Sequence, residues 1–235
     1  MNTSIQTPES GRRSFIKSML AAGVAPLVVS TKLFGKSSPS NQITLGFIGL
    51  GVHGHGYNLN SFLQENDCRA IAVCDVAKDK RETARATVNE HYDVTDCSVI
   101  ADFRELLERK DIDAVVISTP DHWHVTMAIL ALKAGKKVFC EKPTLTIGEG
   151  RELLKAVKKH DAVFATGLED RSVTHYYKIA EAVRNGAIGE LRHIQVGLPI
   201  KPIFPHEDPV AVPDDLDYEL WLGPAPFHDY TPSIT

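Results

Sequence analysis

The chain has 235 residues, of which 43% are hydrophobic and 24% are charged, and its formal net charge is −4. This composition is that of an ordinary globular protein, and the length allows one large domain or two small ones. Nucleic-acid binding usually needs an excess of basic residues, so the acidic balance excludes a nucleic-acid partner from our expectations.

The first forty residues differ from the rest of the chain. Arg12 and Arg13 precede an apolar run from Met19 to Val29, which is too short to span a bilayer. Such a run is typical of a signal-peptide core, and the paired arginines resemble a twin-arginine export signal. We therefore expect residues 1–40 to be a signal peptide and linker, and the protein to be periplasmic or otherwise extracytoplasmic. No stable membrane span is expected after signal removal. The alternative is a basic N-terminus with a weak amphipathic helix.

A glycine-rich turn follows the first strand-like run. Residues 43–48 are apolar and lead into Gly49-x-Gly51-x-x-Gly54, after which the apolar spacing becomes helical. Gly49 permits the tight turn, Gly51 lets the backbone approach phosphates, and Gly54 lets helix and strand pack closely. Because backbone N–H groups and the positive end of the helix dipole face the same point, the turn predicts a pyrophosphate site.

A second strand-like run, residues 70–75, ends in a carboxylate. Asp75 lies at about the spacing expected for the acid that accepts hydrogen bonds from the adenosine ribose. The alternative is a turn residue or a helix cap. Together, the turn and this acid predict dinucleotide binding. A carboxylate here repels a 2′-phosphate, so NAD is expected, although Lys78, Lys80 and Arg81 keep NADP possible.

Strand and helix patterns alternate from Ile43 to Thr166. Continuous apolar runs predict further strands at 114–118, 137–140 and 162–166, and helical spacing separates them. The expected fold is α/β, a Rossmann-type doubly wound parallel sheet that forms an NAD(P)-binding domain over residues 41–168. Right-handed crossovers bring all strand carboxyl ends to one edge, where ligands bind.

Polar residues follow two of these strands, at 118–124 and 141–143. Hydride transfer at a hydroxyl carbon needs a group that handles the hydroxyl proton, and Lys142 is the best candidate for this catalytic role. A solvated lysine after a strand is the alternative. His122 and His124 lie at a helix start, where either could touch nicotinamide ribose or substrate, or could serve as a cap or packing residue. Trp123 fits either the wall of the nicotinamide pocket or the core.

The cysteines predict no metal site. Cys68, Cys74, Cys97 and Cys140 show no CxxC or metal-ligand spacing, and Cys74 and Cys140 lie in apolar runs. We expect buried, inert thiols.

Three motifs resemble the glucose–fructose oxidoreductase / inositol dehydrogenase family, called Gfo/Idh/MocA. They are Gly46-Phe-Ile-Gly-Leu-Gly51, Thr119-Pro-Asp-His-Trp-His124, and residues 131–143 with their Glu-Lys-Pro step. The resemblance runs from Ile43 to about Pro199. It implies a Rossmann domain followed by a mostly antiparallel sheet domain, which carries substrate contacts and often the dimer interface. It therefore also implies a homo-oligomer and a small carbohydrate-type substrate.

The resemblance also implies roles for single residues. In the family the lysine of Glu-Lys-Pro, here Lys142, is catalytic or orients the substrate. The preceding glutamate lies near the nicotinamide ribose, and the residues matching Thr119, Pro120 and His124 lie against the cofactor or near it. Residues 167–172 resemble the segment where the chain leaves the first domain, and there Arg171 is expected to contact cofactor or substrate. The residues expected to bind the cofactor are Gly49, Gly51, Val52, His53, Gly54, Asp75, Thr119, Pro120, His124, Glu141, Lys142 and Arg171.

Residues 169–235 depart from the family pattern. Residues 173–184 resemble its linking helix, residues 191–197 alternate like the first strand of the second sheet, and residues 216–226 resemble a loop of exported members. The rest of the sheet and its Asp-x-x-x-His pair are missing. The expectation is the start of an incomplete α+β substrate domain, in a fragment of a longer protein; a naturally short protein is the alternative.

The sequence thus predicts an NAD(P)-dependent oxidoreductase. It would transfer a hydride between nicotinamide and a hydroxyl carbon of a sugar, polyol or related cyclic compound. One alternative is an NAD-dependent glycoside hydrolase that uses transient redox chemistry. Another, for a chain of this length, is a non-catalytic dinucleotide-binding protein.

Overall fold

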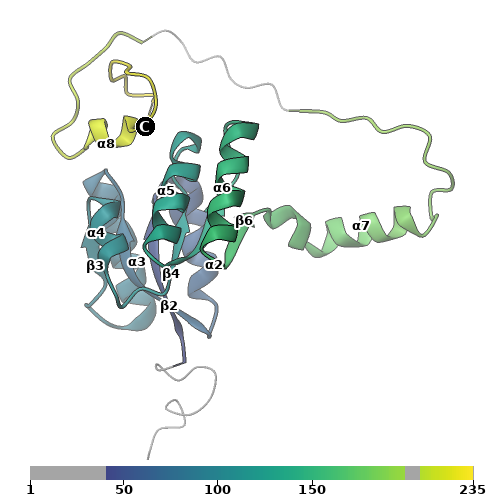
Figure 1. Ribbon diagram of the computed structural model, residues 1–235, viewed down its shortest axis with the longest axis horizontal. Helices are drawn as coiled ribbons and strands as arrows, with labels where there is room; N and C mark the ends of the chain where they lie inside the picture. The colour runs from purple at the N-terminus through teal and green to yellow at the C-terminus, as the bar shows by residue number, and fades with distance from the viewer. Residues whose placement is uncertain (1–40, 199–206, 235) are drawn as a thin grey trace, which may run out of the picture.

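A six-stranded parallel sheet forms the centre of the protein (Figure 1). The structure, a computed structural model, describes residues 41–198 and 207–234, so the predicted signal peptide lies outside the described residues. The strand order is β3-β2-β1-β4-β5-β6, which is the doubly wound Rossmann order and confirms the predicted fold of this part. The strands are β1 (Ile43–Ile48), β2 (Cys68–Cys74), β3 (Ser98–Ile100), β4 (Ala114–Ile117), β5 (Lys137–Glu141) and β6 (Phe164–Gly167).

Helices cover both faces of the sheet. One apolar layer joins the sheet to α4, α5 and α6, and a second joins it to η2, α2 and α3. The π-helical turn η2 runs directly into α2. The bounds are η2 (Gly54–Leu59), α2 (Asn60–Leu63), α3 (Lys78–Tyr92), α4 (Phe103–Glu108), α5 (Asp121–Lys133) and α6 (Ile147–Lys159). Because both faces are covered, the central strands are apolar throughout, as the sequence pattern indicated.

Element boundaries differ from the predictions in several places. Strand β3 was not predicted, because three residues give too little pattern to read. Helix α5 begins at Asp121, just before the two histidines, and Pro120 stands at its N-cap, where a missing N–H costs nothing. Strand β6 covers Phe164–Gly167, two residues later than its predicted start.

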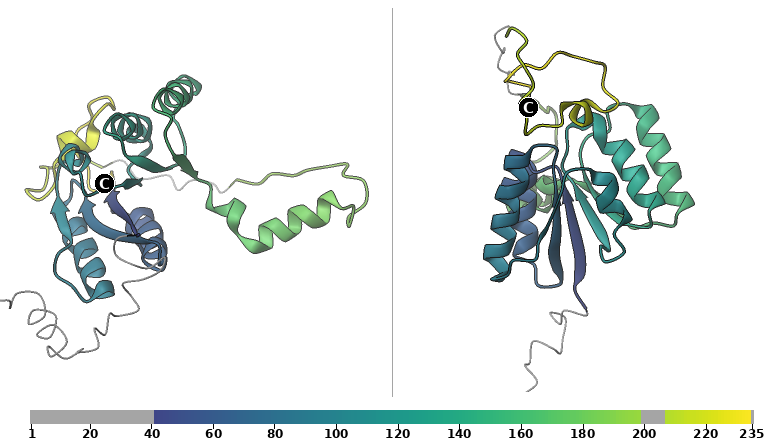
Figure 2. Two further views of the ribbon diagram at one scale, coloured as in Figure 1. Left: turned by 60° about the horizontal axis from the view of Figure 1, so that its bottom comes forward. Right: turned by 90° about the vertical axis from the view of Figure 1, so that its left-hand side faces the viewer.

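The predicted start of a substrate sheet is wrong for the described residues. Residues 191–198 form no strand, and Ile194, Val196 and Leu198 are exposed. After β6 the described chain forms η3 (Glu169–Ser172), α7 (Thr174–Arg184) and α8 (Tyr218–Leu222), without an antiparallel sheet. Alternation decides which side chains share a face, but a strand needs a neighbour to complete its hydrogen-bond ladder. Helix α7 runs away from the sheet, whereas α8 returns to it (Figures 1 and 2).

All four cysteines are free and buried, as predicted. Burial, with smaller effects from nearby carboxylates, raises the pKa of the Cys68 and Cys97 thiols to about 11. The same causes raise the pKa of Cys140 to about 12. These thiols therefore stay protonated and unreactive at neutral pH. In the described part of the chain, no helix has the length and apolar character needed to cross a membrane.

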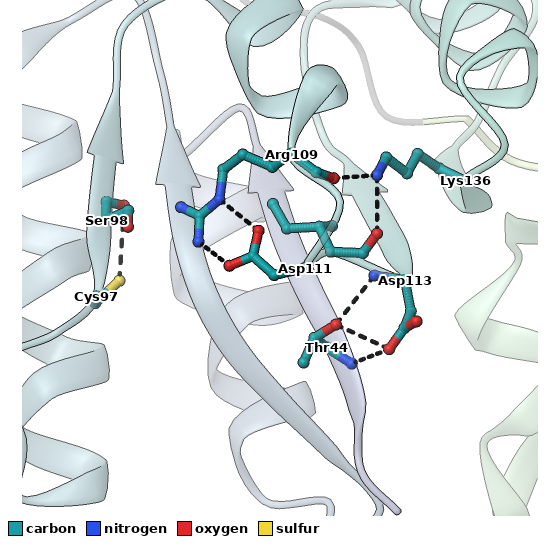
Figure 3. A network of polar contacts seen from close by, with 8 residues as sticks. Thr44, Cys97, Ser98, Arg109, Asp111, Asp113 and Lys136 are labelled. Atoms are coloured by element: carbon teal, nitrogen blue, oxygen red, sulfur yellow. Dashed lines mark hydrogen bonds and ion pairs between the residues drawn. The ribbon is translucent and has the colours of Figure 1, made fainter. Parts of the chain in front are cut away.

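A polar network fixes the amino-terminal end of the sheet (Figure 3). Lys136 is 7% exposed, and its ammonium donates to the carbonyl oxygens of Arg109 and Ile112. Beside it, the Asp113 carboxylate accepts hydrogen bonds from the backbone N–H and the hydroxyl of Thr44, at 2.9 and 2.8 Å. These contacts tie the loop before β4 to the start of β1. Desolvation is the main cause that lowers the pKa of Lys136 below its ordinary value.

We expect Lys136→Met to lower the free energy of unfolding by about 1–3 kcal/mol, because two buried carbonyl oxygens lose their donor. Urea denaturation would measure the change. Lys133→Met is the matched control, since Lys133 is exposed at the end of α5. Equal stability of the two variants would show that the buried ammonium contributes nothing.

Candidate functional site

The glycine turn lies where three strands end. The backbone N–H of Gly49 donates to the carbonyl of Cys74 at 2.9 Å, and Gly49 has a φ of +87°. A Cβ at Gly49 would lie 2.6 Å from the Ser118 backbone, and one at Gly54 would lie 2.0 Å from the carbonyl oxygen of Gly49. A Cβ at Gly51 would meet nothing within 4 Å. Two glycines are therefore required by packing within the protein, while the third faces open space.

Asp75 braces this turn. One carboxylate oxygen accepts the backbone N–H of Leu50 at 2.6 Å, and the other accepts that of Ala77 at 2.9 Å. The Arg81 guanidinium donates to the Asp75 carbonyl at 2.6 Å. Asp75 thus acts as a turn residue, which was the alternative to ribose binding in the sequence analysis. Each carboxylate oxygen can accept a further hydrogen bond. These contacts are therefore compatible with ribose binding by Asp75, which stays a prediction.

A cavity of about 260 Å³ lies against the turn and the Asp75 side chain. Its walls include seven of the residues predicted to bind a cofactor: Gly49, Gly51, Val52, His53, Asp75, Thr119 and Pro120. The buried hydroxyl oxygen of Thr119 has no hydrogen-bond partner among the described residues. A buried hydroxyl without a partner is costly, so its presence in a residue that lines the cavity fits a polar ligand there.

A buried polar network adjoins the cavity at Glu141, which is 7% exposed. One of its carboxylate oxygens lies 2.9 Å from the donating amide of Asn58 and 3.0 Å from Nε2 of His53. Desolvation raises the pKa of Glu141, but the hydrogen bonds from Asn58 and His53 outweigh it and hold the pKa below its ordinary value. The Asn58 amide also donates to the Ser118 hydroxyl at 2.8 Å. The network therefore couples η2 to the ends of β4 and β5.

Lys142 follows Glu141 at the same edge of the sheet. Its side chain is half exposed, and its ammonium lies 3.9 Å from a carboxylate oxygen of Glu169. Ligand atoms of His53, Glu141 and Glu169 all lie within 4.8 Å of one another. Since His53 belongs to the glycine turn, Lys142 and the turn share one edge, as the catalytic hypothesis requires. The role of Lys142 in catalysis stays a prediction.

The two histidines at the start of α5 have structural contacts. His124 is 2% exposed, and its ring nitrogens lie 2.8 and 3.0 Å from the carbonyl oxygens of Thr119 and Pro143. This place fits the packing alternative, and a contact with the cofactor remains a prediction. Nε2 of His122 lies 2.9 Å from the carbonyl oxygen of Trp221. Trp123 is buried against Phe103 and lines the cavity, so it serves the core and the wall together.

Arg171 does not join the cavity. It lies in η3 and lines a separate surface hollow with Tyr177 and Arg184. Sequence reasoning also missed three residues that the structure brings to the cavity from far along the chain: Leu220, Trp221 and Ile234. No local pattern marks them as binding residues, because only the fold places them there.

The strand order, the glycine turn and the cavity at the carboxyl edge together define a dinucleotide-binding Rossmann domain. Residues 43–168 match the family model GFO_IDH_MocA, described as an oxidoreductase family with an NAD-binding Rossmann fold. The chain belongs to this Gfo/Idh/MocA family of NAD(P)-dependent oxidoreductases, as the sequence motifs predicted.

Similar proteins include dehydrogenases and glycosidases. Myo-inositol 2-dehydrogenase of Thermotoga maritima is 32% identical over 62% of this chain and 42% of its own length. A glycosyl hydrolase family 109 protein of Solibacter usitatus is 30% identical over 79% of this chain and 45% of its own. The structure of scyllo-inositol dehydrogenase from Lactobacillus casei with bound NAD(H) and scyllo-inositol is 27% identical, has a TM-score of 0.56, and aligns over 63% of this chain and 43% of that one. The chain therefore spans less than half the length of these relatives.

Proposed function

We propose that the protein is an NAD-dependent oxidoreductase that acts on a hydroxyl carbon of a sugar, polyol or related cyclic compound. The observation that carries the proposal is the cavity lined by the glycine turn, Asp75 and Thr119, whose buried hydroxyl has no hydrogen-bond partner among the described residues. Membership of an oxidoreductase family and similarity to inositol dehydrogenases support the substrate class.

The residues around the cavity fit NAD. Residues 49–54 would hold the pyrophosphate, and Asp75 would accept hydrogen bonds from the adenosine ribose. A carboxylate at this place disfavours the 2′-phosphate of NADP by like-charge repulsion. Lys80 also lines the cavity and is the nearest candidate for binding such a phosphate, whereas Arg81 is occupied by the Asp75 carbonyl. Bound NAD supplies the hydride acceptor.

Lys142 is the group proposed to handle the hydroxyl proton. Its half-exposed ammonium lies 3.9 Å from a carboxylate oxygen of Glu169, at the same edge of the sheet as the glycine turn. Glu141 is less suited to proton transfer, because one of its carboxylate oxygens is already in hydrogen-bond contact with Asn58 and His53. We therefore assign proton transfer at the substrate oxygen to Lys142. To the Glu141 network we assign a structural role, in which it holds the glycine turn against the ends of β4 and β5.

Cofactor binding and turnover test the proposal in two stages. Calorimetric titration should show that NAD binds more tightly than NADP, and a panel of inositols and monosaccharides should then yield reduced nicotinamide in proportion to product. Failure to bind either dinucleotide would refute the whole proposal. Binding without any reduction would instead support a non-catalytic dinucleotide-binding protein.

A second candidate function is glycoside cleavage through transient redox chemistry. The observation that favours it is similarity to glycosyl hydrolase family 109 proteins over more than three quarters of this chain. The two functions differ in their net cofactor use. Release of sugar from an aryl glycoside without accumulation of reduced nicotinamide would establish the glycosidase and exclude the dehydrogenase.

A further inference from the structure

The segment around α8 is hydrogen-bonded to the loop that follows Asp75. The backbone N–H of Lys78 donates to the Asp215 carbonyl at 2.9 Å, and that of Asp217 donates to the Val76 carbonyl at 3.2 Å. Between these two bonds, Ala77 and Leu216 form an isolated antiparallel bridge. Residues 215–217 are thus fixed on the β2 side of the carboxyl edge, about 140 positions after the residues they contact.

The same segment is also attached to the start of α5. The indole N–H of Trp123 donates to the Leu220 carbonyl at 3.0 Å, and the ring of His122 faces the Trp221 carbonyl. A Cβ at Gly223 would lie 2.0 Å from the Trp123 ring, so the chain passes directly over that indole. Two independent attachments therefore hold α8 across the edge of the sheet, where Figure 2 shows it above the ends of the strands.

This position puts an aromatic ring on the cavity wall. Trp221 is only partly buried, and with Leu220 it lines the same cavity as Gly49 and Asp75. Its ring is held edge-on to His122, with centroids 5.6 Å apart, and stacks with Tyr218 at 5.7 Å. A ring fixed in this way on a binding cavity is suited to contact a flat heterocycle at little cost in side-chain entropy.

The attachments also decide which half of a dinucleotide α8 would cover. With the pyrophosphate at residues 49–54, Asp75 and the 76–78 loop lie on the β2 side, and Lys142 lies on the β5 side. Residues 215–217 are bonded to the 76–78 loop, and α8 is bonded to the start of α5, whereas Lys142 contacts Glu169. The cavity that Trp221 lines is also lined by Val76, Lys80 and Ala101, which follow β2 and β3, so the half that this segment would cover is that of the adenosine.

We propose that α8 is a wall of the cofactor site and that Trp221 is the residue that contacts the adenine ring. This inference rests on the proposed binding of NAD. It assigns recognition of the adenosine half to two separate parts of the chain: the carboxylate of Asp75 for the ribose, and the indole of Trp221 for the base.

Calorimetry with ADP-ribose and with nicotinamide mononucleotide tests the assignment. Trp221→Ala should weaken the binding of ADP-ribose and of NAD by about 5- to 100-fold, the range that one base–aromatic contact contributes. It should leave the affinity for nicotinamide mononucleotide unchanged, and Trp221→Phe should retain most of the wild-type affinity for ADP-ribose. Phe227→Ala is the matched control, because Phe227 is an 81% exposed aromatic residue of the same segment that does not line the cavity.

Two results would overturn the inference while leaving the proposed function intact. One is unchanged ADP-ribose affinity in Trp221→Ala, measured with wild-type protein that binds NAD. The other is an equal loss for ADP-ribose and nicotinamide mononucleotide, which would mean that the indole only supports the fold. If the wild-type protein binds none of these ligands, the proposed function itself is wrong.

Discussion

Lys142→Met is expected to lower turnover with the best substrate by about 10²–10⁴-fold, the usual contribution of a positioned acid–base group. Methionine keeps the length of the side chain but can neither donate nor accept the hydroxyl proton. The affinity for NAD should stay close to that of the wild type, because Lys142 is half exposed and does not line the cavity beside Asp75. Steady-state kinetics and calorimetric titration with NAD would measure the two quantities.

Lys137→Met is the matched control for this variant. Lys137 is exposed at the first position of β5, so it lies at the opposite end of the same strand from the Glu141–Lys142 step. We expect its turnover to equal that of the wild type. If Lys142→Met also turns over at the wild-type rate with NAD bound, Lys142 has no part in proton transfer.

Gly49→Ala should destabilise the fold and remove NAD binding together. A φ of +87° costs a residue with a Cβ about 1–2 kcal/mol, and the new methyl group would lie 2.6 Å from the Ser118 backbone. Forced overpacking of this kind adds about 1–3 kcal/mol. The turn would have to move away from β4, and its N–H groups would no longer point at one anion. Urea denaturation and NAD titration would measure both losses.

Gly56→Ala provides the control two residues beyond the motif. A Cβ at Gly56 would meet nothing within 4 Å, and the residue is exposed in η2. Its stability should match or slightly exceed that of the wild type, since alanine favours helical backbone over glycine. Wild-type stability in Gly49→Ala would show that the close approach of the turn to β4 is not required.

The Rossmann part of the fold was predictable because its signals are local. Continuous apolar runs mark β1, β4 and β5, and the switch to helical spacing after Gly54 marks the glycine turn. The capping box of Thr146 and Glu149 likewise fixes the start of α6 from four residues alone. Each of these features depends on neighbours in the sequence, so it can be read without knowing the tertiary structure.

The rest depended on partners that are distant in the sequence. Alternation in residues 191–197 suggested a strand, but no strand pairs with them within residues 41–198 and 207–234. Asn58 reads as an ordinary helix residue, and only the fold places its amide against Glu141 and Ser118. Trp221 likewise lies in a segment that the sequence indicated only as a loop, yet the fold places it in α8 against His122 at the start of α5. Tertiary contacts, and not periodicity, decide the role of such residues.

The four buried, protonated cysteines can be used to measure local unfolding of this protein. Cys74 and Cys140 belong to the apolar layer beneath α4, α5 and α6, whereas Cys68 and Cys97 belong to the layer beneath α2 and α3. An alkylating reagent can modify each pair only when its side of the sheet is exposed to solvent, so labelling rates would time the exposure of the two sides separately. Since all four cysteines are free, the fold is held together without a disulfide.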